Sequence, residues 1–375
     1  MSPFPDHRRA SEPSFGRLFA WLHLDPILLF LLLCVCGIGL TVLYSASGHS
    51  MAVVINQAER LALGLVVMTV AAQAPPEIYR SGAPWFYAIA VLLCALTLML
   101  GDHAKGAQRW LDFGVVRFQP SEMMKLAMPI MVASFLHWFP LPPRWHTVVL
   151  TLAIIGLPTL LVMIQPDLGT SLLIVASGTF ALFLGGLRWS YIFGALAAIG
   201  AAAPILWARL HDYQRQRILT LLDPESDPLG AGYHIAQSKI AIGSGGVFGK
   251  GWMEGTQAKL DFLPESHTDF ILAVYAEELG LVGVSLLLFL YLCIIGRGLY
   301  IAARAQDSFQ RLLAGSLSMT FFVYVFINMG MVIGLLPVVG VPLPMMSYGG
   351  TSMVSLLAGF GILMSIHTHR KLLAS

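Results

Sequence analysis

Ionisable side chains lie within an apolar stretch at residues 263–281, which read LPESHTDFILAVYAEELGL. Helical spacing places Asp269 and Glu277 on one stripe, with the small residues Ala273 and Ala276 between them. An ionisable group at the boundary of an apolar environment is energetically costly and is therefore a functional-site candidate. A partly desolvated carboxylate could take a proton from a hydroxyl, which makes Asp269 a candidate general base.

The same residues also have a purely structural explanation. Pro264, Glu265 and Ser266 resemble the start of a helix in which Ser266 is the N-cap and Asp269 is the acidic residue three positions on, as in a capping box. In that case Asp269 neutralises the helix terminus and takes no part in chemistry. The residues alone leave both interpretations open.

A second group of polar residues lies at 109–125. Arg109 beside Trp110 suits an anionic headgroup next to an apolar tail, although Trp is common at any membrane interface. Pro120 suits the first turn of a helix, on which Glu122 and Lys125 share a face because they are three residues apart. Those two residues either form an ion pair that satisfies itself or contact a substrate.

Residues 237–251 read QSKIAIGSGGVFGKG and superficially resemble a nucleotide-binding P-loop. The pattern fails because Ser244 occupies the place of a required Gly, and Gly251 replaces the required Ser or Thr. Flexible glycines with Lys239 and Lys250 could still offer N–H groups and positive charge to a phosphate.

Two further segments are rich in Pro and Gly, namely 342–352 (PLPMMSYGGTS) and 165–170 (QPDLGT). Irregular backbone in a membrane protein is tolerated only where it lines a protected or water-filled cavity. In the second segment we expect Asp167 to cap the helix that follows.

The composition indicates what must position these residues. Hydrophobic residues make up 57% of the chain and charged residues only 11%, whereas a soluble domain carries about 25% charged residues. This composition predicts an all-α polytopic membrane protein. The net charge of +2 indicates no nucleic-acid partner. The four cysteines (Cys34, Cys36, Cys94 and Cys293) fall in apolar stretches, which favours neither disulfides nor a metal cluster.

Apolar runs long enough to cross ~30 Å of hydrocarbon as helix predict about ten transmembrane spans. We expect them near residues 25–46, 56–74, 84–101, 120–139, 147–164, 168–186, 189–210, 279–298, 311–336 and 351–368. We expect residues 25–375 to form one membrane domain, preceded by a cytoplasmic tail at 1–24 that lacks the pattern of a signal peptide.

Lys and Arg residues indicate the orientation. If both termini are cytoplasmic, the inner segments hold most of these residues, which satisfies the positive-inside rule. The inner ones are Arg8, Arg9, Arg17, Arg80, Arg144, Arg188, Arg297, Arg304, Arg311, Arg370 and Lys371, against Arg60, Lys105, Arg109 and Arg117 in short outer loops. The long fourth outer loop, about 211–266, is then extracytoplasmic, and loops of that length are usually functional.

Three acidic residues lie near the expected start of the eighth span. A span beginning near His267 would carry Asp269, Glu277 and Glu278 into the membrane, and three acids in one span are energetically improbable. We therefore expect residues 266–278 to form a helix on the outer surface that carries Asp269 at headgroup level.

Six separated segments, in this order, resemble the motifs of the SEDS family of shape, elongation, division and sporulation proteins. They are KGAQRWLDFG, QPSEMMK, QPDLGTSLL, GSGGVFGKG, LPESHTDFILAVYAEELGLVG and PLPMMSYGGTS. The resemblance runs from about residue 25 to the C-terminus. QPDLGT, where the division branch (FtsW) usually has an acidic residue in place of Gln165, and VVGVPLPMMSYGG resemble the elongation branch (RodA) more closely.

The resemblance implies ten transmembrane helices and peptidoglycan glycosyltransferase activity on lipid II, at the outer face of the bacterial inner membrane during elongation. It also implies a class B penicillin-binding protein as partner. The aspartate of the family's HTDF motif is catalytic and corresponds to Asp269. The motifs further give Trp110, Glu122, Lys125, Glu265 and His267 as substrate-binding candidates.

A mechanism follows from residues and resemblance together. Asp269 would take the proton of an acceptor hydroxyl, and Arg109, Lys125 and Lys239 would stabilise the leaving pyrophosphate. A lone base without a second carboxylate implies single displacement with inversion. We expect no resident metal site, although a divalent cation, Mg²⁺ or Mn²⁺, could assist the leaving group.

Two other functions compete with glycosyl transfer. A lipid II flippase or transporter would need charged or broken spans along a path across the bilayer, whereas the candidate charges lie towards the outer half and no internal repeat is evident. A non-catalytic scaffold for the penicillin-binding protein would tolerate substitution of Asp269, Trp110 and Lys125.

Overall fold

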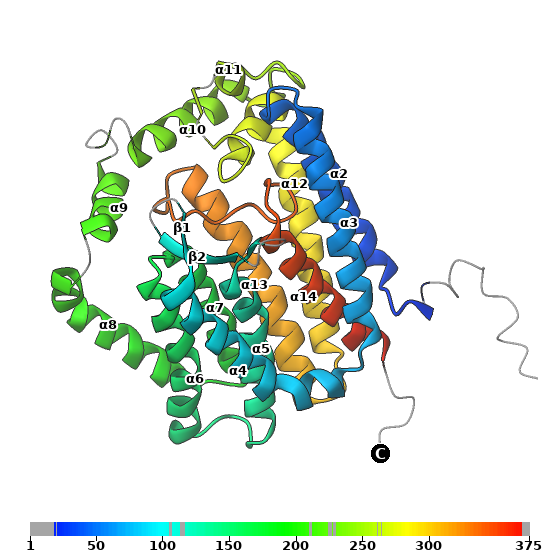
Figure 1. Ribbon diagram of the computed structural model, residues 1–375, viewed down its shortest axis with the longest axis vertical. Coiled ribbons are helices and arrows are strands. Elements are labelled where there is room, and N and C mark those ends of the chain that lie inside the picture. Colours follow the sequence, from blue (N-terminus) through cyan, green and yellow to red (C-terminus); the bar gives the residue numbers. More distant parts are fainter. Residues whose placement is uncertain are drawn as a thin grey trace, which may run out of the picture.

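The computed structural model describes residues 19, 21–104, 107–112, 117–209, 212–223, 227, 230–260, 262–263 and 265–369. Helices occupy all ten predicted spans (Figure 1). They are α2 (Pro26–Ala46), α3 (Met51–Gln73), α4 (Pro76–Leu100), α5 (Pro120–His137), α6 (Trp145–Ile164), α7 (Leu168–Leu184), α8 (Trp189–Arg209), α12 (Ile271–Ala303), α13 (Ser308–Val332) and α14 (Thr351–Thr368). The predicted tail at 1–24 lies mostly outside the described residues.

These helices have the length and composition of membrane spans. Among the described residues, 7 helices are long and apolar enough to cross a membrane, and Leu168–Leu184 and Trp189–Pro204 are shorter apolar helices. The remaining predicted span, α5, carries the buried Glu122 and Lys125. The protein is a multi-pass, all-α membrane protein, as predicted.

Local sequence signals explain where several helices begin. Asp25 caps α2 by accepting from the Leu28 N–H at 2.8 Å, directly before Pro26. Asp167 caps α7 through the Thr170 N–H at 3.3 Å, which confirms the prediction for that residue. Such caps satisfy N–H groups that have no partner within the helix.

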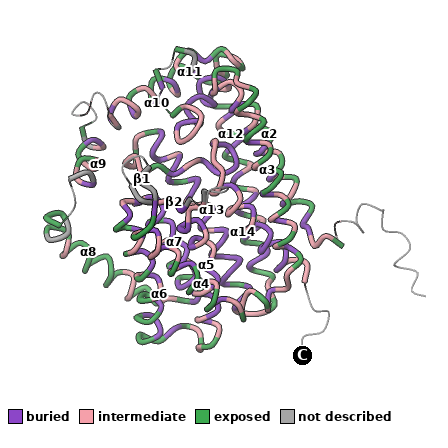
Figure 2. The backbone as a smooth tube through the Cα atoms, in the orientation of Figure 1, coloured by how far each residue is buried: buried purple, intermediate pink, exposed green. Residues whose placement is uncertain are grey.

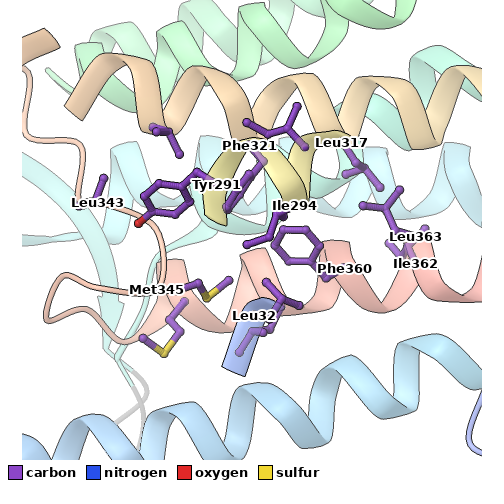
Figure 3. Close-up of a cluster of buried hydrophobic side chains, with 14 of the residues drawn as sticks. Leu32, Tyr291, Ile294, Leu317, Phe321, Leu343, Met345, Phe360, Ile362 and Leu363 are labelled. Carbon is purple, nitrogen blue, oxygen red and sulfur yellow. The ribbon is translucent and has the colours of Figure 1, made fainter. Parts of the chain in front are cut away.

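The core lies between α2, α3, α5, α12, α13 and α14. Buried positions face the centre of this bundle, while the outward faces of the helices are exposed (Figure 2). Leu32, Tyr291, Phe321 and Phe360 interdigitate there with residues of the non-helical 333–350 segment (Figure 3). Tyr291 Oη donates to the Pro344 carbonyl oxygen at 2.6 Å, so the core fixes this segment directly.

The helix bundle has two opposite ends. The termini face is the end where α2 begins and α14 ends, because Asp25 contacts Arg297 and His367 there. The site face is the opposite end, where α2 ends at Ala46 and the chain enters α12. The polar outer segments of the sequence gather at the site face.

The loop at 102–119 forms a small sheet that the sequence did not predict. Strands β1 (Asp102–Ala104), β2 (Ala107–Asp112) and β3 (Arg117–Phe118) pair antiparallel in the order β1-β2-β3. Strand pairing on both sides, with a register irregularity between Asp102 and His103, holds the backbone of β2, which carries Arg109 and Trp110. These residues are therefore held by a folded element.

The described residues of the predicted 211–266 loop include three helices. They are α9 (Asp212–Leu222), α10 (Ala231–Gly245) and the short α11 (Thr256–Lys259). The helices α8 and α9 lie at the edge of the bundle (Figure 1), and no described side chain of α8 is buried. An apolar helix with this exposure suits a lipid environment.

The predicted surface helix at 266–278 is wrong in two respects. Residues 265–270 form turns, and the helix begins only at Ile271. Its first turns are buried within the protein, with Glu277 at 0% and Glu278 at 1% exposure. Protein neighbours therefore supply the polar environment that the prediction assigned to the membrane surface.

Candidate active site

Asp269 lies in a turn that neighbouring elements hold in place. Asn328 of α13 donates through Nδ2 to the Asp269 carbonyl oxygen at 2.8 Å. The Tyr348 N–H donates to the His267 carbonyl oxygen at 2.9 Å, and the rings of these two residues meet edge to face at 6.0 Å. The turn is thus fixed both to α13 and to the 333–350 segment.

A polar cavity of about 210 Å³ lies beside this turn. A Cβ built on Gly340, one of its lining residues, would lie 3.6 Å from Oδ2 of Asp269. The carboxylate therefore abuts the cavity wall that Gly340 forms. Four of the predicted substrate-binding residues line the same cavity: Arg109, Trp110, Glu122 and Lys125.

Glu122 and Lys125 form a buried ion pair in the cavity wall. Lys125 Nζ and Glu122 Oε1 are 2.6 Å apart, and the two side chains are only 6% and 7% exposed. Ser355 Oγ donates to Glu122 Oε2 at 2.8 Å, and Lys125 Nζ lies 5.0 Å from the centre of the Tyr324 ring. This pair is the self-satisfying arrangement considered above, yet it also borders the cavity.

Arg109 is held by a second set of contacts. Its guanidinium donates to the carbonyl oxygens of Gln165 and Pro166, and its Nε lies 3.9 Å from Oδ2 of Asp167. Gln119 Nε2 also donates to that oxygen at 3.2 Å. The Arg109 side chain is 32% exposed and lines the cavity, so it retains access to a ligand there.

An apolar groove of about 830 Å³ adjoins the polar cavity. Its lining includes Leu63 and Val67 of α3, Met123 of α5 and Val354 of α14. The two spaces share five lining residues: Trp110, Glu122, Gly349, Gly350 and Thr351. Cavity and groove together suit a ligand with a charged head and a long apolar tail.

The remaining predicted residues lie elsewhere. His267 contacts Tyr348, which lines the groove. Glu265 is exposed and accepts from Thr268 Oγ1 at 2.8 Å within its own turn. Lys239 is exposed on α10, where it packs beside Gly334. Lys239 and Glu265 are not among the described residues that line the polar cavity.

The capping role considered for Ser266 and Asp269 is not observed. Ser266 Oγ donates to the Ala46 carbonyl oxygen at 3.1 Å. The residue before α12 is Phe270, which makes no side-chain cap hydrogen bond. The structural explanation for Asp269 therefore loses its geometric basis.

The Gly-rich segment binds backbone instead of offering its N–H groups to phosphate. Gly280 interrupts α12 with φ +63°. The N–H groups of Lys250 and Gly251 donate to the carbonyls of Glu277 and Glu278, both at 3.0 Å. On the other side of the break, the N–H groups of residues 281 and 282 donate to the carbonyls of residues 246 and 247 at 3.0 and 3.1 Å. We call these four hydrogen bonds the clasp.

A buried carboxylate reinforces the clasp. Glu277 Oε1 accepts from Lys250 Nζ at 2.7 Å and from both the N–H and the Oγ1 of Thr256 at 2.9 Å. This use of Glu277 explains how an acid is tolerated at 0% exposure. The two acids that share a stripe in the sequence therefore have separate positions in the structure: Glu277 lies at the clasp and Asp269 beside the cavity.

Sequence reasoning missed two residues beside Asp269 and the cavity. Asp167, predicted only as a cap, also lines the cavity and contacts Arg109. Asn328 contacts the backbone of Asp269. A buried amide in an otherwise apolar span, FINMGMV, is the signal that could have indicated Asn328.

No group of three or more His, Cys, Asp or Glu side chains that could hold a metal ion occurs among the described residues. Mg²⁺ is usually bound by one or two carboxylates together with substrate phosphates. The carboxylates of Glu122 and Asp167 line the cavity. This donor set matches an ion that enters with a phosphate ligand better than a resident metal.

The arrangement combines a carboxylate, two cations and an apolar groove. Lys125 and Arg109 can stabilise negative charge in the cavity, and the groove can hold an apolar chain. The carboxylate of Asp269 is next to the cavity, on the side of Gly340. These are the elements of a transfer reaction from a lipid-linked, phosphorylated donor.

Several proteins are similar to this chain in sequence. The family model FTSW_RODA_SPOVE, described as "Cell cycle protein", matches residues 26–372. The chain is 57% identical over 354 residues to the peptidoglycan glycosyltransferase MrdB of Escherichia coli K12, covering 94% of this chain and 96% of that protein. A probable peptidoglycan glycosyltransferase FtsW of Geobacter metallireducens is 38% identical over 320 residues, which are 82% of this chain and 83% of that protein.

Solved structures share the fold. A chain of a peptidoglycan synthase complex that coordinates polymerisation and crosslinking has a TM-score of 0.81 at 29% identity, covering 92% of this chain and 99% of that chain. The rod shape-determining protein RodA of Thermus thermophilus has a TM-score of 0.70 at 27% identity, with coverage of 92% and 98%. The chain belongs to the FtsW/RodA/SpoVE family of cell cycle proteins, the SEDS family whose motifs its sequence carries.

Proposed function

We propose that this protein is a peptidoglycan glycosyltransferase that polymerises lipid II into glycan strands during cell elongation. The observation that carries the proposal is the joining of the polar cavity to the apolar groove, with Asp269 at the cavity wall. Lipid II has a sugar, a pyrophosphate and a polyprenyl tail, which match Asp269, the polar cavity and the apolar groove respectively. The activity named for the relative at 57% identity supports the same conclusion.

The reaction is a single displacement at the anomeric carbon of the donor. The 4-hydroxyl oxygen of the acceptor GlcNAc forms a bond to C1 as the bond from C1 to the pyrophosphate oxygen breaks. Asp269 takes the hydroxyl proton, since a neutral hydroxyl is a poor nucleophile. One displacement without a covalent enzyme intermediate inverts the configuration at C1.

The leaving pyrophosphate needs positive charge around it. Lys125 is held in the cavity wall by Glu122, and Arg109 is held by Gln165, Pro166 and Asp167. Fixed cations stabilise developing negative charge without reorganisation during the reaction. We infer that a divalent cation, Mg²⁺ or Mn²⁺, enters with the pyrophosphate, with Glu122 and Asp167 as its protein ligands.

The position of the site supports an orientation and a partner. Lipid II is polymerised outside the cell, so the site face is extracytoplasmic and both termini are in the cytoplasm of a bacterium, with the protein in its inner membrane. The Lys and Arg distribution supports this orientation. The similarity to a chain of a peptidoglycan synthase complex supports a class B penicillin-binding protein as partner.

Replacement of Asp269 tests the function. Asp269→Asn keeps the shape of the side chain and removes the base, so polymerisation of lipid II by the purified protein should fall by about 10²–10⁴-fold. Glu59→Gln, the same change at an exposed position of α3, is the matched control and should retain full activity. Normal polymerisation by folded Asp269→Asn would reject Asp269 as the base.

A further inference from the structure

Asn328 is a buried amide that joins two segments of the site. It lies in α13 with 0% exposure. Its Nδ2 donates to the Asp269 carbonyl oxygen and to the Val341 carbonyl oxygen, both at 2.8 Å. Both N–H groups of one amide are therefore used to connect backbone segments that are far apart in the sequence.

One of the two carbonyls belongs to the residue proposed as the base, and the other belongs to a residue of the cavity wall. Asp269 carries the proposed base, and Val341 follows Gly340, beside which the carboxylate lies. Both Gly340 and Val341 line the polar cavity. Neither segment is helical at these residues, so Asn328 supplies a connection that regular backbone hydrogen bonding does not.

The buried amide of Asn328 carries an energetic cost. Asn328 Oδ1 is buried and has no hydrogen-bond partner among the described residues. An unsatisfied buried acceptor is destabilising, and a leucine of similar size would avoid this cost in an apolar helix. The geometry therefore indicates that the two donors are the reason for an amide at this position.

We propose that Asn328 is a positioning residue for Asp269, which it holds at a fixed distance from the cavity wall. This inference rests on the proposed role of Asp269 as the base. Only a planar amide offers two N–H donors that diverge towards two carbonyls while remaining uncharged. Loss of the bridge leaves the substrate-binding residues in place and frees the turn that carries the base.

Kinetics of the purified full-length protein on lipid II test the proposal. Asn328→Leu removes both donors with little change in volume, and Ser318→Ala removes a buried hydroxyl of the same helix that bonds only within α13, to the Ala314 carbonyl. A misplacement of ~1 Å costs about 10²-fold in rate. We expect kcat of Asn328→Leu to fall by about that factor relative to Ser318→Ala, with KM within about threefold.

The outcomes separate this inference from the proposed function. If folded Asn328→Leu keeps kcat within about threefold of the control, or loses activity only through KM, Asn328 does not position the base. Should Asn328→Leu fail to fold, Asn328→Ala, which also removes both donors, is judged by the same criteria. Absence of lipid II polymerisation by the unmodified protein would reject the function itself, and full activity of Asp269→Asn would reject Asp269 as the base. An inactive Asp269→Asn beside a fully active Asn328→Leu rejects only the present inference.

Discussion

Two buried ionic clusters lie at opposite ends of this protein, and they differ in what surrounds them. At the termini face, Asp25 accepts from the Leu28 N–H, Arg297 and His367 and is 0% exposed. At the site face, Glu122 and Lys125 are almost equally buried but line a cavity. Arg297 and His367 are 18% and 24% exposed, so the termini-face cluster is partly open at its cations, whereas the site-face pair is buried in the wall of a cavity that could hold a ligand.

The difference separates a structural ion pair from a functional one. Asp25 joins the start of α2 to residues of α12 and α14, so its contacts connect three helices. Burial of charge without good partners is costly in either place. A cluster whose acceptors all meet protein groups stabilises the fold, whereas one that borders a cavity can also exchange interactions with a substrate.

The largest expected effect is on activity at the site face. Lys125→Met keeps the length of the side chain and removes the cation, so polymerisation should fall by about 10²–10³-fold, as when one group that stabilises transition-state charge is lost. The double variant Glu122→Gln with Lys125→Met leaves no unpaired charge and should recover thermal stability without recovering activity. If the double variant polymerised lipid II normally, the site-face pair would be structural as well.

Asp25→Asn should have its main effect on stability at the termini face. Asn can still cap α2, but it leaves Arg297 with a neutral partner, and breaking a buried ion pair costs about 3–5 kcal/mol. Thermal unfolding in detergent should show this loss, while turnover per folded molecule stays within about twofold of the unmodified protein. A large drop in turnover would end the distinction between the two clusters.

The termini-face cluster also predicts a pH dependence of stability. Burial would raise the pKa of Asp25, but hydrogen bonds from His367, Arg297 and the Leu28 N–H outweigh it and hold the pKa well below its ordinary range. An Asp in the unfolded chain has a pKa of ~3.9. The stabilisation is complete above that pH and declines, by up to about 1.4 kcal/mol per pH unit, as the pH falls towards the pKa of the folded state.

Lowering the pH from 5 to 3 should therefore reduce the free energy of unfolding of the unmodified protein more than that of Asp25→Asn. The difference in free energy of unfolding between the two proteins should shrink by about 1 kcal/mol over this range. Parallel curves for the two proteins would show that Asp25 does not carry the dependence.

The smallest effect is expected just outside the termini-face cluster. Arg304 lies 4.8 Å from the centre of the Tyr300 ring, and Arg297 lies 5.1 Å from the same ring. Arg304 is exposed, so Arg304→Gln should lower the free energy of unfolding by at most about 0.5–1 kcal/mol and leave activity unchanged. A loss as large as that of Asp25→Asn would extend the structural cluster to Arg304.

Apolar runs and helix-start residues predict the ten spans, because membrane helices are set mainly by local composition. The site is predictable only where one motif supplies neighbouring residues, as for Glu122 and Lys125. Asn328 and Gly340 reach Asp269 from distant parts of the chain, and no local pattern encodes that contact. Glu265 shows the converse, because motif membership alone does not bring a residue to the cavity.

The break in α12 has the same explanation. Gly280 can leave the helix because residues 246–251 satisfy the exposed backbone groups on both sides of it. Side chains and N–H groups beside the clasp explain the buried acids that made a single helical span improbable from sequence: Lys250 and Thr256 bond the Glu277 carboxylate, and Ser45 bonds that of Glu278. A pattern-based prediction treats each segment separately and therefore places those acids at the surface.

The clasp has a consequence for how this segment can evolve. Its hydrogen bonds are made by backbone, and Val247 and Phe248 are 54% and 83% exposed, so their side chains can drift freely among related chains. A Cβ at Gly249 would lie 2.1 Å from the Glu278 carbonyl oxygen, and one at Gly280 would lie 2.3 Å from the Gly249 nitrogen. Any larger residue at either position would clash with backbone unless residues 246–251 and α12 moved together. We therefore expect both positions to remain glycine among related chains while their neighbours diversify.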